Sequence, residues 1–257
     1  MKGDNMTEVN DPSLWWKQAV VYQVYPRSFK DSRGEGLGQL AGVTEKIGYL
    51  KELGVDAIWL SPFYPSQLPD GGYDVDDYRN VDPKLGTMDD FDALAKAAHA
   101  DGIKIVVDIV PNHSSNLHEW FKAALAAKPG SPERGRYIFR DGKGPNGDEP
   151  PTNWQNHFGG PAWTRVPDGQ WYLHMFTKEQ PDWNWKNEDV RADFIKTLRF
   201  WLDHGADGFR VDVAHGLAKD LDRDDLDDYV VWCTNDQPED GSHPVIDRDE
   251  VHDIYHE

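Results

Sequence analysis

The chain has 257 residues, a formal net charge of −19, 38% hydrophobic and 12% aromatic residues, and enough apolar content for one large core. The negative charge argues against binding to phosphate backbones or to anionic membrane surfaces. The single cysteine, Cys233, allows no intrachain disulfide and fits a reducing compartment. No apolar run reaches membrane-spanning length or resembles a signal peptide, so we expect a soluble cytoplasmic protein.

Strands and helices are predicted to alternate along the first half of the chain. Residues 1–13 are polar and are expected to be frayed. The predicted elements that follow are a strand at 19–24, a helix at 40–53, a strand at 57–60, a helix at 88–100 and a strand at 103–110. This order is typical of consecutive parallel βα units.

Two of these elements carry specific expectations about burial. The first strand is rich in valine and suits a position buried on both faces. The first helix has apolar residues along one face, at Leu40, Val43, Ile47, Leu50 and Leu53. Gly54 is the expected end of that helix, because glycine readily adopts the left-handed conformation of a helix stop.

The alternation breaks at residues 114–185, which are rich in Gly, Pro, Trp and Asn and contain no long periodic element. A stretch of this length predicts a functional insertion or a small irregular subdomain. A helix at 190–204, ended by Gly205, then leads to a fourth strand, GFRVD. The acidic residues 217–257 are expected to form solvated loop and helix.

The motif GFRVDVAHG, residues 208–216, reads as a short buried strand that ends on a carboxylate. Alternation places Arg210 and Asp212 on the same side, with Phe209, Val211 and Val213 on the other. A neighbouring guanidinium favours the ionised carboxylate, which suits a base or nucleophile at neutral pH. A structural ion pair is the alternative interpretation.

The position of other polar residues favours function over that alternative. They follow the second, third and fourth strands, as Asp70, Tyr73 and Asp74, then Asp108, Asn112 and His113, then Arg210, Asp212 and His215. In a parallel barrel the downstream strand ends share one rim, where the active site is built. Structural ion pairs would have no reason to collect there.

The chain resembles the α-amylase family of glycoside hydrolases, and most closely its α-glucosidase and oligo-1,6-glucosidase branch. The matching motifs, in the family's order, are YQVYPRSF (22–29), GVDAIWLSPFYPS (54–66), GGYDVDDYRNVDP (71–83), DIVPNHSS (108–115), QPDWNW (180–185) and GFRVDV (208–213). The resemblance implies an α/β (β/α)8 TIM barrel. This chain would hold the first three βα units (1–113), an irregular inserted subdomain (114–185), and the fourth unit with an acidic segment (186–257).

The resemblance also implies roles for individual residues. Asp212 would be the nucleophile of a retaining exo-acting α-glucosidase and would form a covalent glucosyl-enzyme, with Arg210 orienting it. The substrate would be a malto- or isomalto-oligosaccharide or a disaccharide. The expected sugar-binding residues are His113 for a hydroxyl, Tyr73 for stacking, Asp70 for the far hydroxyls, Asp108 as the supporting aspartate with Asn112 shaping its loop, and Phe176 lining the pocket.

The loop after the first strand resembles the calcium loop of this family branch, which has oxygen ligands at alternate positions. Asp31, Glu35 and the Leu37 carbonyl could serve as ligands, but Arg33 and Gln39 occupy two other liganding places. A cationic side chain opposes binding of a cation, so we expect no metal and no other cofactor.

A second departure concerns the general acid. Retaining hydrolysis needs a second carboxylate about 5–5.5 Å from the nucleophile, and in this family a glutamate after the fifth strand supplies it. Glu250 and Glu257 do not follow a strand-like run. We therefore expect half a barrel, inactive by itself, whose partner is the missing C-terminal half or a second copy of the chain.

Other functions remain open at this point. A trehalose synthase or a sucrose isomerase shares every motif quoted. A truncated inert member is a further alternative, as is a non-catalytic member like the ancillary subunits of amino-acid transporters, although those lose the nucleophile that Asp212 retains. Val213, directly after Asp212, leaves the choice between α-1,4 and α-1,6 bonds open.

Overall fold

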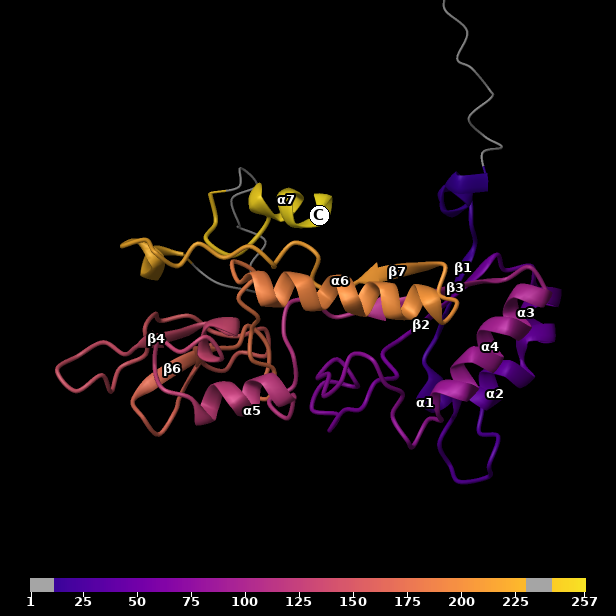
Figure 1. The fold of residues 1–257 in the computed structure, drawn as a ribbon, viewed down its shortest axis with the longest axis horizontal. Coiled ribbons are helices and arrows are strands. Elements are labelled where there is room, and N and C mark those ends of the chain that lie inside the picture. The colour runs from indigo at the N-terminus through magenta and orange to yellow at the C-terminus, as the bar shows by residue number, and fades with distance from the viewer. Residues whose placement is uncertain (1–11, 230–241) are drawn as a thin grey trace, which may run out of the picture.

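Four parallel strands and a separate antiparallel sheet organise the computed structural model, which describes residues 12–229 and 242–257. The parallel sheet has the order β1-β2-β3-β7, with β1 at Val21–Val24, β2 at Ala57–Leu60, β3 at Lys104–Ile109 and β7 at Gly208–Val211. The antiparallel sheet has the order β4-β6-β5, with β4 at Phe139–Asp141, β5 at Trp163–Arg165 and β6 at Gln170–Leu173. Figure 1 shows the two sheets towards opposite ends of the long axis.

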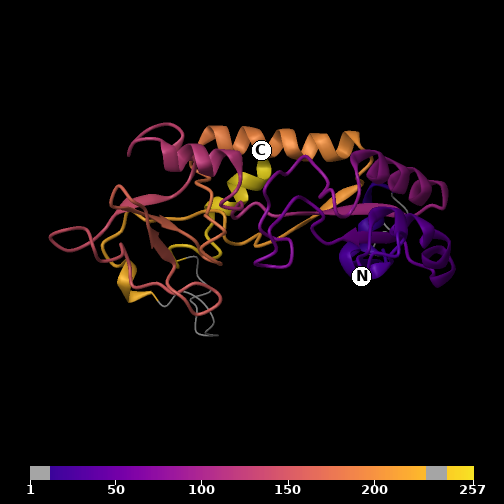
Figure 2. The same ribbon diagram turned by 90° about the horizontal axis from the view of Figure 1, so that it is seen from below.

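The helices connect and cover these sheets. They are α1 (Pro26–Phe29), α2 (Leu40–Glu45), α3 (Ile47–Leu53), α4 (Met88–Ala100), α5 (Glu119–Ala126), α6 (Glu188–Asp203) and α7 (Glu250–His256), with 3-10 helices at Pro12–Lys17, Arg134–Arg136 and Leu226–Asp228. Helix α6 runs along one side of the molecule, with the antiparallel sheet and α5 towards one end and α2 to α4 at the other (Figure 2). The predicted alternation of strands and helices is confirmed as an α/β arrangement.

The elements with strong local signals begin and end as predicted. Strand β2 and helix α4 have the expected bounds, and Thr87 and Asp90 form a capping box at the start of α4. Gly54 and Gly205 have φ angles of 83° and 99°, so both helix stops are the left-handed glycines that the sequence predicted.

The predicted helix at 40–53 is two helices. The backbone of Lys46 leaves the helical conformation (φ −103°, ψ 3°) and separates α2 from α3. Leu40 and Leu50 are fully buried, but Leu53 is 52% exposed. A non-helical residue shifts the helical phase, so Leu53 does not share the buried face as predicted.

The predicted burial of the two outer strands is wrong. Val21 in β1 is 48% exposed and only Val24 is buried, while every residue of β7 is half-buried. Both strands lie at the edges of the described sheet, where one side lacks a neighbour. Val213 has a φ of 49°, so the strand alternation ends before it and Val213 does not share a face with Phe209.

The largest apolar core is formed by residues of the parallel sheet, of helices α2 to α6 and of the loops between them. Trp201 of α6 is fully buried, and its ring lies 5.2 Å from that of Phe63 and 4.8 Å from that of Phe91. Its indole nitrogen donates to the Tyr78 carbonyl at 2.8 Å, which satisfies the one polar group that the buried ring carries. This packing fixes α6, and with it the start of β7, against the loop that follows β2.

The insertion contains more regular structure than the sequence predicted. Helix α5 and strands β4, β5 and β6 lie within residues 114–185. Phe121 and Tyr137 belong to the main apolar core, whereas Trp154 and Leu173 belong to a second cluster. Short elements of this kind are missed because their stability comes from packing with each other and not from a long periodic pattern.

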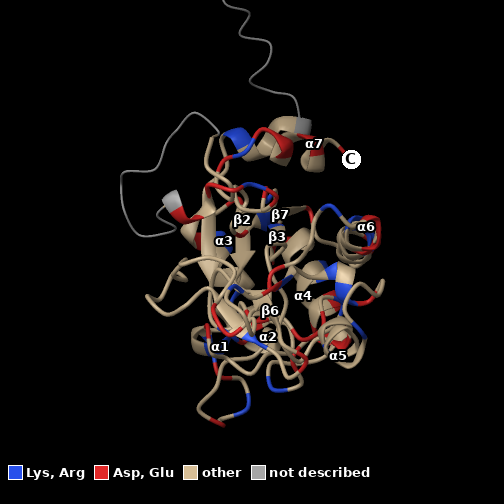
Figure 3. Ribbon diagram, turned by 90° about the vertical axis from the view of Figure 1, so that its left-hand side faces the viewer, with Lys and Arg blue, Asp and Glu red and all other residues tan. Residues whose placement is uncertain are grey.

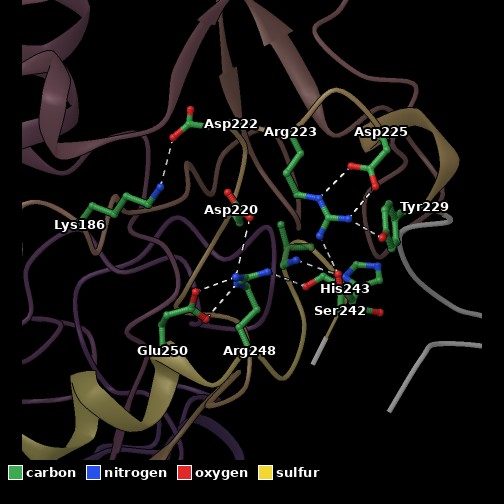
Figure 4. Close-up of polar contacts among 11 residues, drawn as sticks. Lys186, Asp220, Asp222, Arg223, Asp225, Tyr229, Ser242, His243, Arg248 and Glu250 are labelled. Atoms are coloured by element: carbon green, nitrogen blue, oxygen red, sulfur yellow. Dashed lines mark hydrogen bonds and ion pairs between the residues drawn. The ribbon is translucent and has the colours of Figure 1, made fainter. Parts of the chain in front are cut away.

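The acidic segment after β7 is only partly solvated, contrary to prediction. Leu217 and Val245 are 1% and 2% exposed. Arg248 forms a two-pronged ion pair with Glu250 (2.6 and 3.1 Å), and Arg223 does the same with Asp225 (Figure 4). Acidic and basic residues both occur along α6 (Figure 3), whereas α7 carries the acidic residues Glu250 and Asp253 and no Lys or Arg.

Two predicted features lie outside the described residues: most of the polar N-terminus and the single cysteine, Cys233. In the described part of the chain, no helix is long and apolar enough to cross a membrane.

Candidate active site

Arg210 lies between two carboxylates at the downstream edge of the parallel sheet. Strands β3 and β7 are in a register that pairs Asp108 with Arg210, and Asp212 follows two residues later. Nη1 of Arg210 is 2.5 Å from Oδ1 of Asp212 and 3.3 Å from each carboxylate oxygen of Asp108. The strand geometry that the sequence predicted thus brings Arg210 and Asp212 together and adds Asp108 as a second partner.

The carboxylates of Asp108 and Asp212 differ in their exposure to solvent. The side chain of Asp108 is fully buried, whereas that of Asp212 is 16% exposed. Burial raises the pKa of Asp108 to about 7, and Arg210 opposes this rise. Only the Asp212 carboxylate is therefore open to an incoming molecule, while Asp108 is placed to support Arg210 from behind.

The net pKa of Asp212 moves in the direction opposite to our expectation. Arg210 lowers it, as predicted, but burial is the larger influence and raises the pKa above its ordinary value. The sequence revealed the guanidinium two residues away, but it did not reveal how much water the folded loops remove from the carboxylate.

Two aromatic residues complete the surroundings of Asp108. The indole nitrogen of Trp59 donates to Oδ2 at 2.9 Å, and the hydroxyl of Tyr73 donates to the same oxygen at 3.3 Å. The guanidinium carbon of Arg210 lies 4.9 Å from the centre of the Trp59 ring. Trp59 therefore contacts both members of the Asp108–Arg210 pair, although sequence reasoning gave it no role.

His113 is fully buried and contacts the backbone of Tyr73. Its Nε2 lies 3.2 Å from the Tyr73 carbonyl, and its ring centre lies 4.8 Å from that of Phe176. Burial lowers the pKa of His113 to about 3, so the ring is neutral at physiological pH. The ring of Phe176 also stacks on His157 at 4.0 Å, which places both rings of the insertion beside His113.

Gln180 connects Asp70, the remaining residue that the sequence predicted for the site, to His113. Its Nε2 donates to Oδ2 of Asp70 at 3.0 Å and lies 2.9 Å from Nε2 of His113. Gln180 is fully buried, and it belongs to the QPDWNW motif, none of whose residues was given a role from the sequence. The structure thus links Asp70, His113, Tyr73, Asp108, Arg210 and Asp212 through direct contacts and this one glutamine.

Asp74 does not join the site. Its carboxylate accepts hydrogen bonds from the Ser66 hydroxyl at 2.6 Å and the Gln67 backbone at 2.9 Å, so it holds its own loop together. Glu250 pairs with Arg248 at 2.6 Å, and Glu257 pairs with Arg191. Both glutamates therefore have partners in or beside α7 and not among the site residues.

The loop at 31–39 does not fit a divalent cation. The carboxylate of Asp31 accepts hydrogen bonds from the backbone nitrogens of Arg33 (2.9 Å), Gly34 (2.7 Å) and Gly36 (2.7 Å), which lower its pKa to about 2. The side-chain amide of Gln39 donates to the Leu37 carbonyl. Donors of the chain itself thus occupy two of the three candidate ligands. Across the described ranges, no group of three or more His, Cys, Asp or Glu side chains could hold a metal ion.

A cavity of about 400 Å³ lies away from Asp212, between the insertion, α6 and α7. The Lys and Arg side chains that line it have acidic partners, as in the pairs Arg140–Asp222 and Lys186–Asp222, each at 3.3 Å. Most of the charged side chains of the cavity are therefore paired within the chain.

A carboxylate held in place by neighbouring side chains is the group that glycosidases use at the bond that they cleave. The family model "Alpha amylase, catalytic domain" matches residues 23–255, and the chain belongs to this family of glycoside hydrolases. The resemblance drawn from the six motifs is therefore confirmed.

The chain is also similar to individual members of this family. The chain is 50% identical to an oligo-1,6-glucosidase of Heyndrickxia coagulans over 83% of its own length. Its structure matches a trehalose-6-phosphate hydrolase of Bacillus licheniformis (TM-score 0.82, 44% identity, 93% of the chain). It also matches the trehalulose synthase MutB of Pseudomonas mesoacidophila (TM-score 0.76, 50% identity, 80% of the chain), a mutant of which was solved with sucrose. The chain spans only 36–41% of the length of these relatives.

Proposed function

We propose that this chain supplies the nucleophile half of the active site of a retaining exo-acting α-glucosidase. In this proposal, residues 1–113 and 186–257 contribute the first four βα units of a (β/α)8 barrel, and residues 114–185 form a subdomain over its rim. The observation that carries the proposal is the placement of Asp212: it is the accessible carboxylate of the Asp108–Arg210–Asp212 cluster.

Asp212 attacks the anomeric carbon of a bound glucoside as the bond to the glycosidic oxygen breaks and that oxygen leaves with a proton from the general acid. Water later hydrolyses the covalent glucosyl-enzyme. Arg210 holds the Asp212 carboxylate in position through Oδ1 at 2.5 Å and offsets the rise in pKa that burial causes. Because an oxocarbenium-like transition state develops positive charge, a fixed carboxylate beside it lowers the barrier.

The neighbouring residues bind the remainder of the glucose ring. Tyr73 is half-buried and offers an aromatic face, and Phe176 lines the opposite side from the insertion. Asp70 and His113 bind hydroxyls, and their common contact with Gln180 keeps them together. Carbohydrate recognition of this kind combines an aromatic surface with fixed polar groups.

The reaction needs a second carboxylate about 5–5.5 Å from Asp212 as general acid and base. Neither Glu250 nor Glu257 is placed for this, since each pairs with an arginine. We therefore propose that the acid comes from a partner segment and that the 257-residue chain by itself does not hydrolyse p-nitrophenyl α-glucoside. Measurable turnover by the purified, mass-verified chain would contradict this part of the proposal.

The nucleophile can be tested on the chain itself with 5-fluoro-α-glucosyl fluoride, because fluoride is a good leaving group and depends little on a general acid. We expect the mass of one fluoroglucosyl group to be added at Asp212, and no addition in Asp212→Asn. Asp222→Asn is the control, since Asp222 is exposed and lies near α7. Labelling of another residue, or equal labelling of Asp212→Asn, would refute the assignment.

An isomerising enzyme is the second candidate. It is favoured by the similarity to trehalulose synthase, whose mutant structure contains sucrose. Transfer of the glucosyl group to a second sugar uses the same nucleophile as hydrolysis does, and only the acceptor differs. Product analysis of the complete protein with sucrose and with maltose separates the two, because an isomerase yields a new disaccharide and a hydrolase yields free glucose.

A further inference from the structure

A buried ion pair lies directly behind His113. Lys219 comes from the loop after β7, and Asp182 comes from the insertion, and their side chains are 4% and 0% exposed. The Lys219 Nζ lies 2.8 Å from Oδ1 of Asn112, 2.7 Å from the Gly216 carbonyl and 3.2 Å from Oδ2 of Asp182. The Asn112 oxygen and the Gly216 carbonyl accept hydrogen bonds from this ammonium group, whereas Asp182 is its ion-pair partner.

Lys219 determines which way the Asn112 side chain faces. An ammonium only donates, so the Asn112 atom next to it must be the carbonyl oxygen. The amide nitrogen of Asn112 then points the other way, 3.0 Å from Nδ1 of His113 and 3.3 Å from Oδ1 of Asp182. Asp182 accepts from this nitrogen, so both members of the ion pair favour the same amide orientation.

The Asn112 amide in turn determines where His113 carries its proton. An amide nitrogen only donates, so Nδ1 of His113 must present its lone pair to it. A neutral imidazole with a lone pair on Nδ1 has its hydrogen on Nε2. The neutral state is supported by the burial of His113, which lowers its pKa to about 3.

Nε2, the other ring nitrogen of His113, has two contacts. The first agrees with this tautomer, and the second opposes it. Nε2 of His113 lies 3.2 Å from the Tyr73 carbonyl, which can only accept. It also lies 2.9 Å from Nε2 of Gln180, a donor whose amide orientation is held by Thr177 at 3.1 Å and Asp70 at 3.0 Å. A proton on Nε2 satisfies both Asn112 and Tyr73, whereas a proton on Nδ1 would satisfy Gln180 alone.

We propose that Lys219 is a positioning residue that acts through Asn112 and fixes neutral His113 with its proton on Nε2. His113 then presents a hydrogen-bond donor on the side of the site where Asp70 and Tyr73 lie. This inference deepens the proposed function, because it defines which sugar oxygen, an acceptor, His113 can bind. Its test needs no sugar, so failure of the nucleophile assignment and failure of the tautomer assignment are separate outcomes.

The test is long-range ¹H–¹⁵N NMR of the 257-residue chain with ¹⁵N-labelled histidine at neutral pH, with His113 assigned by loss of its signals in His113→Gln. We expect one tautomer, with the Nδ1 shift of an unprotonated nitrogen and the Nε2 shift of a protonated one. A proton on Nδ1, or on both nitrogens, would overturn the proposal.

The role of Lys219 is tested by Lys219→Met/Asp182→Asn, which removes both charges of the pair and leaves no unpaired buried ion. We expect loss of the single tautomer, with both nitrogen shifts moving towards each other. Lys186→Met, which removes an exposed lysine paired with Asp222, is the matched control and keeps the wild-type shifts. A folded double variant with the wild-type tautomer would show that Lys219 does not determine it.

If the double variant shows no cooperative unfolding, and is therefore not folded, a second variant tests the same proposal. Asn112→Asp keeps an acceptor for Lys219 but replaces the donor nitrogen that faces His113 with an acceptor oxygen. We expect the proton of His113 to appear on Nδ1 in this variant. Retention of the proton on Nε2 alone would refute transmission through Asn112.

Discussion

Asp108 and Arg210 face each other in register on adjacent parallel strands, and the Nη1 of Arg210 is 3.3 Å from both oxygens of Asp108. The side chain of Asp108 is fully buried, whereas that of Arg210 is 38% exposed, so only the carboxylate side of the pair is removed from water. A charge pair at the end of two neighbouring strands holds Arg210 in the direction of Asp212. The Asp108–Arg210 pair is thus supported by the sheet itself.

Trp59→Phe should weaken this support. The phenyl ring still lies near Arg210, but the hydrogen bond from the indole nitrogen to Asp108 (2.9 Å) is lost. We expect a loss of about 1–2 kcal/mol in the free energy of unfolding, measured with urea. The pKa of Asp108 should rise above about 7, because a donor to its ionised form is removed.

The control for this variant is Trp171→Phe, which removes an indole hydrogen bond to the Gly147 carbonyl at 3.1 Å in the insertion. It should leave the titration of Asp108 unchanged, as followed by the carboxyl ¹³C shift. An unchanged Asp108 titration in Trp59→Phe would show that the indole contact is unimportant to the pair.

His118→Asn should make stability less dependent on pH. Nδ1 of His118 accepts a hydrogen bond from the Trp120 backbone at the start of α5, and asparagine can replace it as a helix cap. Burial lowers the pKa of His118 from its ordinary 6.5 to about 4. Because the unfolded chain binds the proton more tightly, the stabilisation is present above pH 6.5 and is lost as pH falls towards 4, by up to about 3 kcal/mol.

Urea unfolding at pH 7.5, 6 and 5 measures this difference between wild type and His118→Asn. Other buried groups act in both variants: His113 and His157 in the same direction, and Asp108, whose pKa is raised to about 7, in the opposite one. His252→Asn, at an exposed position, is the control. The free energy of unfolding of this variant should change with pH as that of the wild type does. An equal slope in His118→Asn would contradict the prediction.

Gly42→Ala and Gly48→Ala should have opposite effects on the stability of the fold. A Cβ on Gly42 would lie 2.1 Å from the Lys30 carbonyl oxygen, so the backbone must move, at about 1–3 kcal/mol. A Cβ on Gly48 meets no atom within 4 Å, and alanine should stabilise helix α3 by about 0.5–1 kcal/mol. Thermal unfolding of both variants measures the two changes. Equal tolerance at both positions would show that α2 does not pack closely on the loop that carries Lys30.

Calcium should not stabilise the wild-type loop at 31–39, because the Leu37 carbonyl and Asp31 are already hydrogen bonded within the chain. Arg33→Asn/Gln39→Asp restores oxygen ligands at both alternate positions. We expect millimolar calcium to raise the melting temperature of this double variant and to leave that of the wild type unchanged. A calcium-dependent melting temperature in the wild type would contradict the prediction.

Local patterns predicted those features that neighbouring residues determine. Strand β2 and helix α4 have their expected bounds because apolar periodicity and the Thr87 cap act within a few residues. The break at Lys46, the exposure of β1 and the antiparallel sheet of the insertion depend on contacts with distant segments. Sequence patterns carry no direct signal for such contacts.

The same distinction applies to the site. The sequence by itself determined the family and the types of residue that follow the strands, because those are motifs of adjacent residues. Only the tertiary structure decided that burial outweighs Arg210 at Asp212, that Trp59 supports Asp108, and that Gln180 and Lys219 lie against the histidine loop. The physical reason is that desolvation and hydrogen bonding between residues 49 to 110 positions apart arise only when the chain is packed.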